Sequence, residues 1–240
     1  MGQMSLTKAS VALLLLIYTT AATVIPLREL HFTSDRYSQS YETRAAGEEY
    51  RLPPTVTPHL YTITLTPNYT DYNTFNGEVT ILVTALSDVN NISLHYDKIT
   101  IVERSITEII GSEIALEEDN NDSYDNTTNI YTLTLSNNQT LTSGRSYFIN
   151  INYTGLLLDD MAGFYRSSYK TADGEERWLA TTQFEPTDAR RAFPCFDEPG
   201  LKAVFQIKIR RPTNMTSISN APLARTEPYV FRAQIYLTLK

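Results

Sequence analysis

Hydrophobic and polar residues alternate along much of the chain beyond residue 55. In residues 60–65, Tyr61, Ile63 and Leu65 fall on one side of the alternation, and the intervening residues fall on the other. Successive side chains of a β-strand point to opposite faces of a sheet, so a period of two is typical of a strand with one buried face. This segment is therefore predicted to be a strand.

Seven further segments have the same character. They are rich in Val, Ile, Thr, Tyr and Phe, and turn residues separate them at short intervals, as in an all-β sandwich. No helix of ordinary length competes with them. The predicted fold class is therefore all-β, a β-sandwich, with further strands at 77–84, 99–102, 106–110, 129–135, 146–153, 177–182 and 204–210.

The first 22 residues have the pattern of a secretory signal peptide. A weakly basic start at Lys8 is followed by an apolar run over 11–18 and by small residues at 20–22. The run is shorter than the roughly 20 residues that span a bilayer, and the small residues resemble a cleavage site. Residues 1–22 are therefore predicted to be removed, with a buried helix or an uncleaved anchor as the alternative.

The remaining boundaries follow from composition. Residues 23–49 are polar and lack sustained periodicity, so they are predicted to be a linker or stalk. The β domain is predicted to span 50–222, and 223–240 form a divergent tail. The acidic, Asn-rich segment 116–129 lacks the glycine and glutamate of an EF-hand calcium loop, so it is interpreted as a solvated hairpin tip.

Seven N-x-S/T sequons follow the predicted signal peptide. Each is a weak signal alone, but together with the signal peptide they indicate the secretory route. The chain is therefore expected to be secreted or to lie on the extracellular face of the plasma membrane. Glycans need solvent-facing turns, so the sequon-rich stretch 121–152 is expected at the surface. The predicted glycosylation sites are Asn68, Asn91, Asn121, Asn126, Asn138, Asn152 and Asn214.

Charge and composition exclude several classes of function. The net charge is −7, which favours neither nucleic acid nor an anionic membrane as a partner. A single cysteine, Cys195, rules out an internal disulfide and any zinc site with several thiolates, and it is expected to be buried. The three histidines, His31, His59 and His95, are too widely spaced for an H-E-x-x-H zinc site. No cofactor is therefore expected in this chain.

One region, 159–199, is dense enough in aromatic and charged residues to carry chemistry. It is interpreted as loop-like and placed between strands. Glu185 leaves the end of a predicted strand just before a proline, where its carboxylate could accept hydrogen bonds from a ligand ammonium group. The alternative is a structural ion pair between Glu185 and Arg190 or Arg191.

The sequence of this region resembles a known family. Residues 182–199, TQFEPTDARRAFPCFDEP, are similar to the hallmark segment of the amino-terminal domain of M1-family zinc aminopeptidases, the aminopeptidase N group. Further agreement lies at 51–54 with Pro58 and Tyr61, at 75–77 (FNG) and at 161–167 (MAGFYRS). The resemblance covers about 50–222. It implies a saddle-like all-β domain that packs against a separate thermolysin-like catalytic domain, in which the zinc lies.

The resemblance also implies roles for individual residues. Glu185 matches a position that binds the free α-amino group of the peptide substrate, and Gln183 matches a position in the same pocket. Asp197, Glu198 and Pro199 match a structural turn and ion-pair network. The implied partners are a peptide amino terminus and the catalytic domain of the parent enzyme, with membrane attachment only through a further carboxyl-terminal part.

The sequence departs from the family pattern in two ways. It contains neither the G-x-M-E-N motif nor the H-E-x-x-H motif, so we expect this chain alone to bind no zinc stoichiometrically and to be inactive. Residues 223–240 do not align with the family, as in a truncated or alternatively spliced product or a faulty gene model. The alternative function is a non-catalytic secreted glycoprotein that binds peptides or a protein partner. A partial product should expose the apolar face that meets its missing domain.

Overall fold

The computed structural model describes residues 12–15, 48–109, 113–114, 122–136 and 139–229. Strands dominate these residues, and their only helical elements are two single-turn 3-10 helices, η2 (Glu48–Tyr50) and η4 (Ala189–Arg191). The all-β prediction is confirmed. Within the described ranges, no helix has the length and apolar character needed to cross a membrane.

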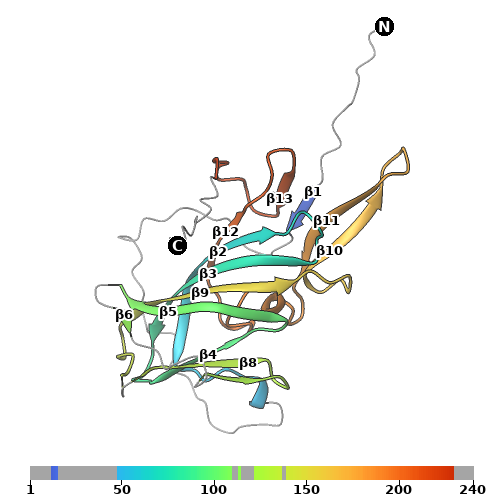
Figure 1. Cartoon of the computed structure of the whole chain (residues 1–240). Coiled ribbons are helices and arrows are strands. Elements are labelled where there is room, and N and C mark those ends of the chain that lie inside the picture. Colours follow the sequence, from blue (N-terminus) through green and yellow to red (C-terminus); the bar gives the residue numbers. More distant parts are fainter. Residues whose placement is uncertain (1–11, 16–47, 110–112, 115–121, 137–138, 230–240) are drawn as a thin grey trace, which may run out of the picture.

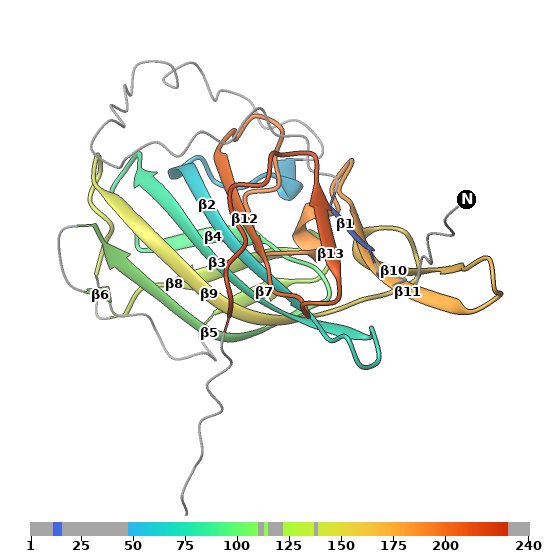
Figure 2. The ribbon, with the colours of Figure 1, turned by 90° about the horizontal axis from the view of Figure 1, so that it is seen from above.

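A twisted six-stranded sheet forms the centre of the molecule (Figures 1 and 2). Neighbouring strands are antiparallel, except that the edge strand β12 runs parallel to β2. In spatial order the strands are β12 (Val204–Ile209), β2 (Val56–Pro67), β3 (Thr74–Ala85), β9 (Ser146–Leu156), β5 (Ile99–Glu108) and β6 (Glu113–Ile114).

A three-stranded sheet covers one face of the large sheet (Figure 1). It consists of β4 (Asn91–His95), β8 (Ile130–Thr134) and β7 (Ser123–Asp125). The hydrophobic core lies between the two sheets and draws buried side chains from both. Tyr61, Ile63 and Leu65 belong to it with exposed fractions of 2%, 1% and 1%, as their alternation predicted.

A second small sheet has the order β10-β11-β1-β13. Strands β10 (Gly163–Lys170) and β11 (Glu176–Gln183) form a hairpin, and β13 (Thr216–Ser219) lies at the opposite edge. Between them runs β1 (Ala12–Leu15), parallel to both β11 and β13. This strand falls in the predicted signal peptide, whose cleavage stays a prediction.

The structure corrects several of the predicted element boundaries. Segments 99–102 and 106–110 are not two strands, because β5 runs through both with a bulge between Ile101 and Glu103 that interrupts the alternation. The region 159–169 is not a continuous loop, because β10 begins at Gly163. The outer half of β10 extends beyond the core and is exposed, so it has no alternating pattern to detect. The short strands β4, β7 and β13 were not predicted.

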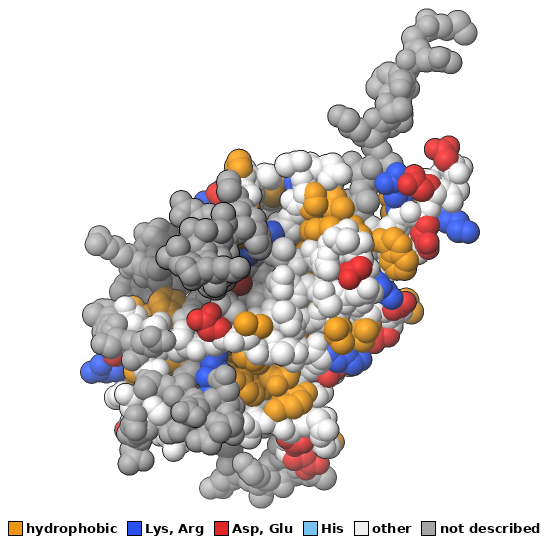
Figure 3. Space-filling view, viewed as in Figure 1, with side chains coloured by type: hydrophobic (Ala, Val, Ile, Leu, Met, Phe, Trp, Pro, Cys, Tyr) orange, Lys and Arg blue, Asp and Glu red, His pale blue; other side chains and the backbone are white. Residues whose placement is uncertain are grey.

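Among the described residues visible in Figure 3, exposed apolar side chains lie in separate groups among polar side chains. The most exposed large ones come from different parts of the fold, including Val102 on β5, Met161 before β10 and Leu223 after β13. On this face, apolar exposure therefore does not favour the partial-domain interpretation over a freestanding glycoprotein.

Candidate functional site

Glu185 lies just beyond the end of β11, and its side chain is exposed to solvent. Gln183, the last residue of β11, is also exposed, and its amide donates a long hydrogen bond to the Glu185 carbonyl oxygen (3.4 Å). The two preceding residues, Thr181 and Thr182, are buried. The strand therefore ends where the chain leaves the core, which places the two predicted site residues together at the surface.

The ion pair left open between Glu185 and a nearby arginine is not formed. Arg190 donates from its guanidinium Nε to Asp197 Oδ2 at 2.9 Å. Arg191 pairs with Asp160, which lies 31 residues away in the chain. Both arginine side chains are mostly buried, so these pairs hold the loop and leave the Glu185 carboxylate outside their network.

Asp197 and Glu198 have the structural role that was predicted for them. Asp197 is the partner of Arg190 within the same loop. Glu198 accepts hydrogen bonds from the Leu52 backbone N–H (2.6 Å) and from the Arg51 guanidinium (2.9 Å) at the start of the domain. The loop after Glu185 is thus closed on itself by one ion pair and tied to the start of the domain by another.

Two buried tyrosines anchor the middle of the loop. The Tyr153 hydroxyl donates to the Ala192 carbonyl oxygen (2.8 Å), and the Tyr61 hydroxyl accepts from the Phe196 N–H (3.1 Å). Between these anchors, Cys195 is 3% exposed, as predicted, and burial raises the pKa of its thiol well above the usual range. A protonated, inaccessible thiol is unreactive, so Cys195 acts as a small apolar side chain.

Gly163 links the stretch 161–167 to the loop that follows Glu185. Its φ is +70°, and a Cβ atom there would lie 2.4 Å from the Cβ of Arg191. Any larger residue would therefore collide with η4, the turn of the loop that carries Arg191. Sequence reasoning did not identify Asp97 and Asp160 as partners of Arg191, because each lies on a different segment from the loop.

His95 is fully buried behind the loop. Its backbone exchanges two hydrogen bonds with Cys195, at 2.8 and 3.0 Å, and its Nε2 lies 3.2 Å from the Tyr50 carbonyl oxygen. Burial and, more weakly, the positive charge of Arg190 lower the pKa of His95, whereas the Tyr50 carbonyl, Asp197 and Glu198 act in the opposite direction. The imidazole is therefore held in its neutral form.

We expect the domain to lose stability as the pH falls through the ordinary histidine pKa of about 6.5. The pKa of His95 is lower in the folded than in the unfolded chain, so the unfolded chain takes up a proton at a higher pH. The contribution of His95 to the free energy of unfolding therefore decreases as the pH falls below the ordinary histidine pKa. His95→Gln should flatten the dependence of Tm on pH. Burial also lowers the pKa of His59, so His59→Gln is the matched control. It leaves the part of the pH dependence of Tm that arises from His95 unchanged. An unchanged slope in His95→Gln would contradict the assignment.

The described residues do not provide a zinc site. They contain no group of three or more His, Cys, Asp or Glu side chains placed to hold a metal ion. His59 is hydrogen-bonded to Thr84, His95 lies against a carbonyl, and His31 lies outside the described residues. The donor set of this part of the chain thus does not fit the zinc of the M1 enzymes.

The predicted glycosylation sites differ in their surroundings. Asn126 and Asn214 are exposed in turns, and Asn68 is partly buried in the turn after β2. Asn91 and Asn152 lie in strands β4 and β9, so the expectation that every sequon occupies a turn is wrong. Asn152 is nevertheless exposed, whereas Asn121 and Asn138 lie outside the described residues.

Comparison with known proteins agrees with this architecture. The model of the family described as Peptidase M1 N-terminal domain matches residues 57–235. Membrane alanyl aminopeptidase of Manduca sexta is 36% identical over 189 residues, which cover 74% of this chain and 19% of that protein. Endoplasmic reticulum aminopeptidase 1 of Homo sapiens is 39% identical over 176 residues (73% and 18%), and aminopeptidase N of Bos taurus 37% over 186 residues (72% and 18%).

The structure is thus an all-β domain in which the exposed Glu185 follows the end of β11. The loop that continues to Glu198 is fixed by ion pairs and hydrogen bonds. The chain belongs to the family of M1 peptidase N-terminal domains. It spans less than a fifth of the length of the curated relatives that it matches.

Proposed function

We propose that this chain is the amino-terminal β domain of a secretory-pathway zinc aminopeptidase and forms one wall of the substrate pocket. Glu185 binds the α-amino group of the peptide, and Gln183 lines the same pocket. The observation that carries the proposal is the exposed Glu185 carboxylate at the end of β11, outside the ion pairs that hold the adjoining loop.

The geometry suits recognition of a peptide amino terminus. A carboxylate binds an ammonium group through a charge-assisted hydrogen bond, which is stronger than a bond between neutral groups. The loop after Glu185 is tied down by Arg190, Glu198 and Tyr153, so the chain that follows the carboxylate is held in place before the substrate arrives. When the carboxylate that binds the amino group lies at a constant distance from the reacting centre, the bond that is cleaved lies at a fixed distance from the amino terminus of the peptide.

The hydrolytic chemistry belongs to another part of the parent enzyme under this proposal. The described residues hold no suitable set of metal ligands, and the chain contains no H-E-x-x-H motif. Relatives named as membrane and endoplasmic reticulum aminopeptidases support the secretory route. This chain contributes binding and orientation, and by itself it performs no hydrolysis.

Glu185→Gln, made in the M1 enzyme chain that carries this domain, is expected to raise KM for a peptide with a free amino terminus by roughly 10- to 100-fold. A hydrogen bond to a charged group contributes about 1.5–3 kcal/mol, and about 1.4 kcal/mol corresponds to a factor of ten. The bond is present both in the bound substrate and in the transition state, so kcat should change less than KM. Steady-state kinetics with an aminoacyl p-nitroanilide measures both constants.

Asp173→Asn is the matched control for this experiment. Asp173 is also an exposed carboxylate, but it lies at the tip of the β10–β11 hairpin. Its loss should leave KM unchanged. If Glu185→Gln also leaves KM unchanged in an enzyme with normal kcat and Tm, Glu185 does not bind the amino group.

A further inference from the structure

The outer face of the six-stranded sheet, turned away from the core, carries a ladder of polar side chains. The Thr80 hydroxyl donates to Asn150 Oδ1 (2.9 Å), and Asn150 Nδ2 donates to the Ser105 hydroxyl (3.3 Å). One step further along β9, Asn152 Nδ2 donates to Glu103 Oε2 (2.9 Å). These hydrogen bonds cross β3, β9 and β5, and they order the side chains on an otherwise solvent-exposed surface.

The bulge in β5 places Glu103 on this face. Ile101 and Arg104, three residues apart, pair with residues of β9 whose side chains belong to the core. The extra residue is Val102, which is 64% exposed. It shifts the register so that Glu103 stands opposite Asn152, whereas a regular strand would turn Arg104 outward. Without the bulge, Val102 would stand opposite Asn152, so it is the bulge that brings the Glu103 carboxylate to Asn152.

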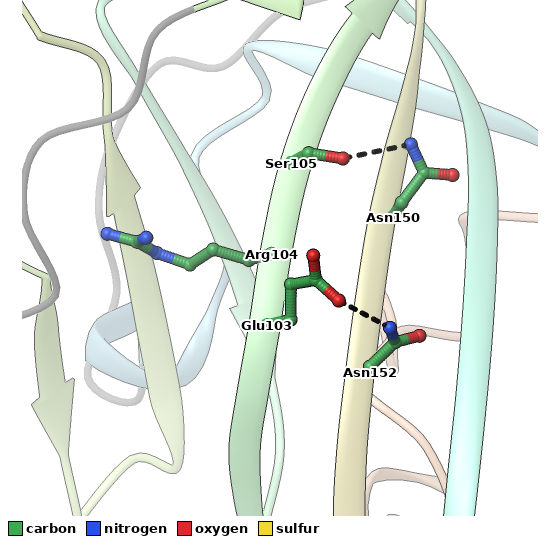
Figure 4. A pocket seen from close by; sticks show the side chains of 5 residues that line it. All are labelled: Glu103, Arg104, Ser105, Asn150 and Asn152. Carbon is green, nitrogen blue, oxygen red and sulfur yellow. Dashed lines mark hydrogen bonds between the residues drawn. The ribbon is translucent and has the colours of Figure 1, made fainter. Parts of the chain in front are cut away.

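A shallow pocket of about 200 Å³ lies over these residues. Figure 4 shows Glu103, Ser105, Asn150 and Asn152 grouped on one side of β5 and β9, while Arg104 points to the other side. Ser105 accepts the Asn150 amide and so keeps its own O–H to donate, and Glu103 uses one of its two carboxylate oxygens with Asn152. Neutral and acidic hydrogen-bonding groups of this kind suit a ligand rich in hydroxyl groups.

Asn152 is itself a sequon residue, followed by Tyr153 and Thr154. Transfer from a lipid-linked oligosaccharide forms a bond between Nδ2 and C1 of the sugar, breaks the bond from C1 to the lipid diphosphate, and releases the diphosphate and one Nδ2 proton. The modified nitrogen retains one N–H. That N–H can continue to donate to Glu103, which lines the pocket together with Asn152.

We propose that Asn152 carries an N-linked glycan whose first N-acetylglucosamine is seated in the pocket formed by Glu103, Ser105 and Asn150. The inference rests on the secretory route of the proposed function. Hydroxyl groups of the sugar donate to Glu103 and accept from Ser105. The outer face over β5 and β9 is then covered by carbohydrate, so the catalytic domain of the parent enzyme packs against a different surface.

The first experiment measures occupancy. The full chain is expressed in mammalian cells, and the secreted protein is treated with peptide-N-glycosidase in heavy-oxygen water, which leaves a labelled aspartate at each occupied site. Label is expected at Asn152. Label at Asn126 or Asn214 without label at Asn152 overturns this proposal and leaves the secretory route intact. The absence of label from every sequon of the secreted protein also overturns this proposal, whereas failure of the chain to be secreted at all would overturn the secretory route of the proposed function.

The second experiment tests whether the first sugar occupies the pocket. Thr154→Ala removes the acceptor motif without altering Asn152, and Thr154→Ser keeps it. In the mammalian protein, Tm of Thr154→Ala should lie about 2–4 °C below that of Thr154→Ser, as expected for about one net hydrogen bond in a domain of this size. The same two variants made in a bacterial host without N-glycosylation should have equal Tm values. A difference in Tm there would show that the effect comes from Thr154 itself and would contradict binding of the sugar in the pocket.

A pocket variant completes the test. Adding Ser105→Ala to both Thr154 variants should shrink the glycan-dependent difference in Tm, because the sugar loses one of its donors. Asn126→Gln is the control for glycan loss at a turn outside the pocket, and it should leave Tm unchanged. A difference that is equally large with and without Ser105 would show that the sugar does not occupy the pocket.

Discussion

Asp122→Ala is expected to lower the free energy of unfolding by about 3–5 kcal/mol, as when one partner of a buried ion pair is removed. Asp122 accepts hydrogen bonds from the Arg104 guanidinium, from the Tyr131 hydroxyl and from the Thr134 backbone N–H. The Asp122 and Arg104 side chains are 6% and 8% exposed. The pKa of Tyr131 is raised by burial and by the bond to Asp122, so its hydroxyl remains a donor at all ordinary pH values.

The large effect arises because this cluster joins the two main layers. Arg104 lies on β5 of the six-stranded sheet, whereas Tyr131 and Thr134 lie on β8 of the small sheet. Removing the carboxylate takes away a shared acceptor from donors that have little access to water. Unfolding in guanidinium chloride, followed by tryptophan fluorescence and circular dichroism, measures the change.

A triple variant separates the ion pair from simple packing. Arg104→Met, Asp122→Leu and Tyr131→Phe together remove every side-chain donor and acceptor of the cluster, so stability should recover most of the loss seen in Asp122→Ala. The sequon at Asn121 is retained in all these variants, because its middle position tolerates alanine or leucine. A cost below about 1 kcal/mol for Asp122→Ala would place the pair in water and contradict its burial.

Gly77→Ala is the second substitution with a large expected effect. Gly77 on β3 stands opposite Tyr153 on β9, and a Cβ atom at Gly77 would lie 2.1 Å from the Tyr153 ring. The ring would have to move, although it is fully buried and packs edge-on against Phe75. Overpacking of this kind costs about 1–3 kcal/mol. Loss of the Tyr153 hydrogen bond to Ala192 adds about 1 kcal/mol.

The expected result is a decrease in Tm of about 5–15 °C, because 1 kcal/mol shifts Tm by about 2–4 °C in a domain of this size. Tyr153→Phe isolates the hydrogen bond and should account for the smaller part of the loss. Gly200→Ala is the matched control, since a Cβ atom there meets nothing within 4 Å. Equal Tm values for Gly77→Ala and Gly200→Ala would contradict the close approach of Tyr153.

This contact also gives a physical reason for the FNG stretch at 75–77. Phe75 packs over Gly155 on the neighbouring strand, and Tyr153 packs over Gly77 in the reverse direction. Each aromatic ring therefore needs a glycine opposite it. Tyr153 in turn holds Ala192 in the loop beyond Glu185. The stretch thus supports the loop beyond Glu185 through the Tyr153 hydroxyl.

Most regular strands were well predicted, and irregular or marginal strands were not. β2, β3, β8, β9, β11 and β12 each overlap a segment identified from its pattern. The alternation in β5 is broken at Val102, because a bulge adds one residue and reverses the facing of those that follow. In β10 most residues are exposed, so burial imposes no pattern on them.

Sequence reasoning placed Glu185 at the end of a strand, but it left open whether Arg190 or Arg191 would neutralise it. Proximity in the chain favoured that pair. In the fold, Arg191 instead binds Asp160, and Arg190 turns toward Asp197. Which acid each arginine meets depends on how the loop packs against β4 and β10, and no local pattern encodes that packing.

Local periodicity and turn residues were sufficient to establish an all-β fold class and the strand at whose end the candidate residues lie, because both depend on neighbours one or two positions apart. The exposure of Glu185, the burial of Asp122 between two sheets and the pocket beside Asn152 all required packing in three dimensions. Each of these features joins segments that are distant in the chain. Their pairing is determined by the register of strands and by the space between the layers.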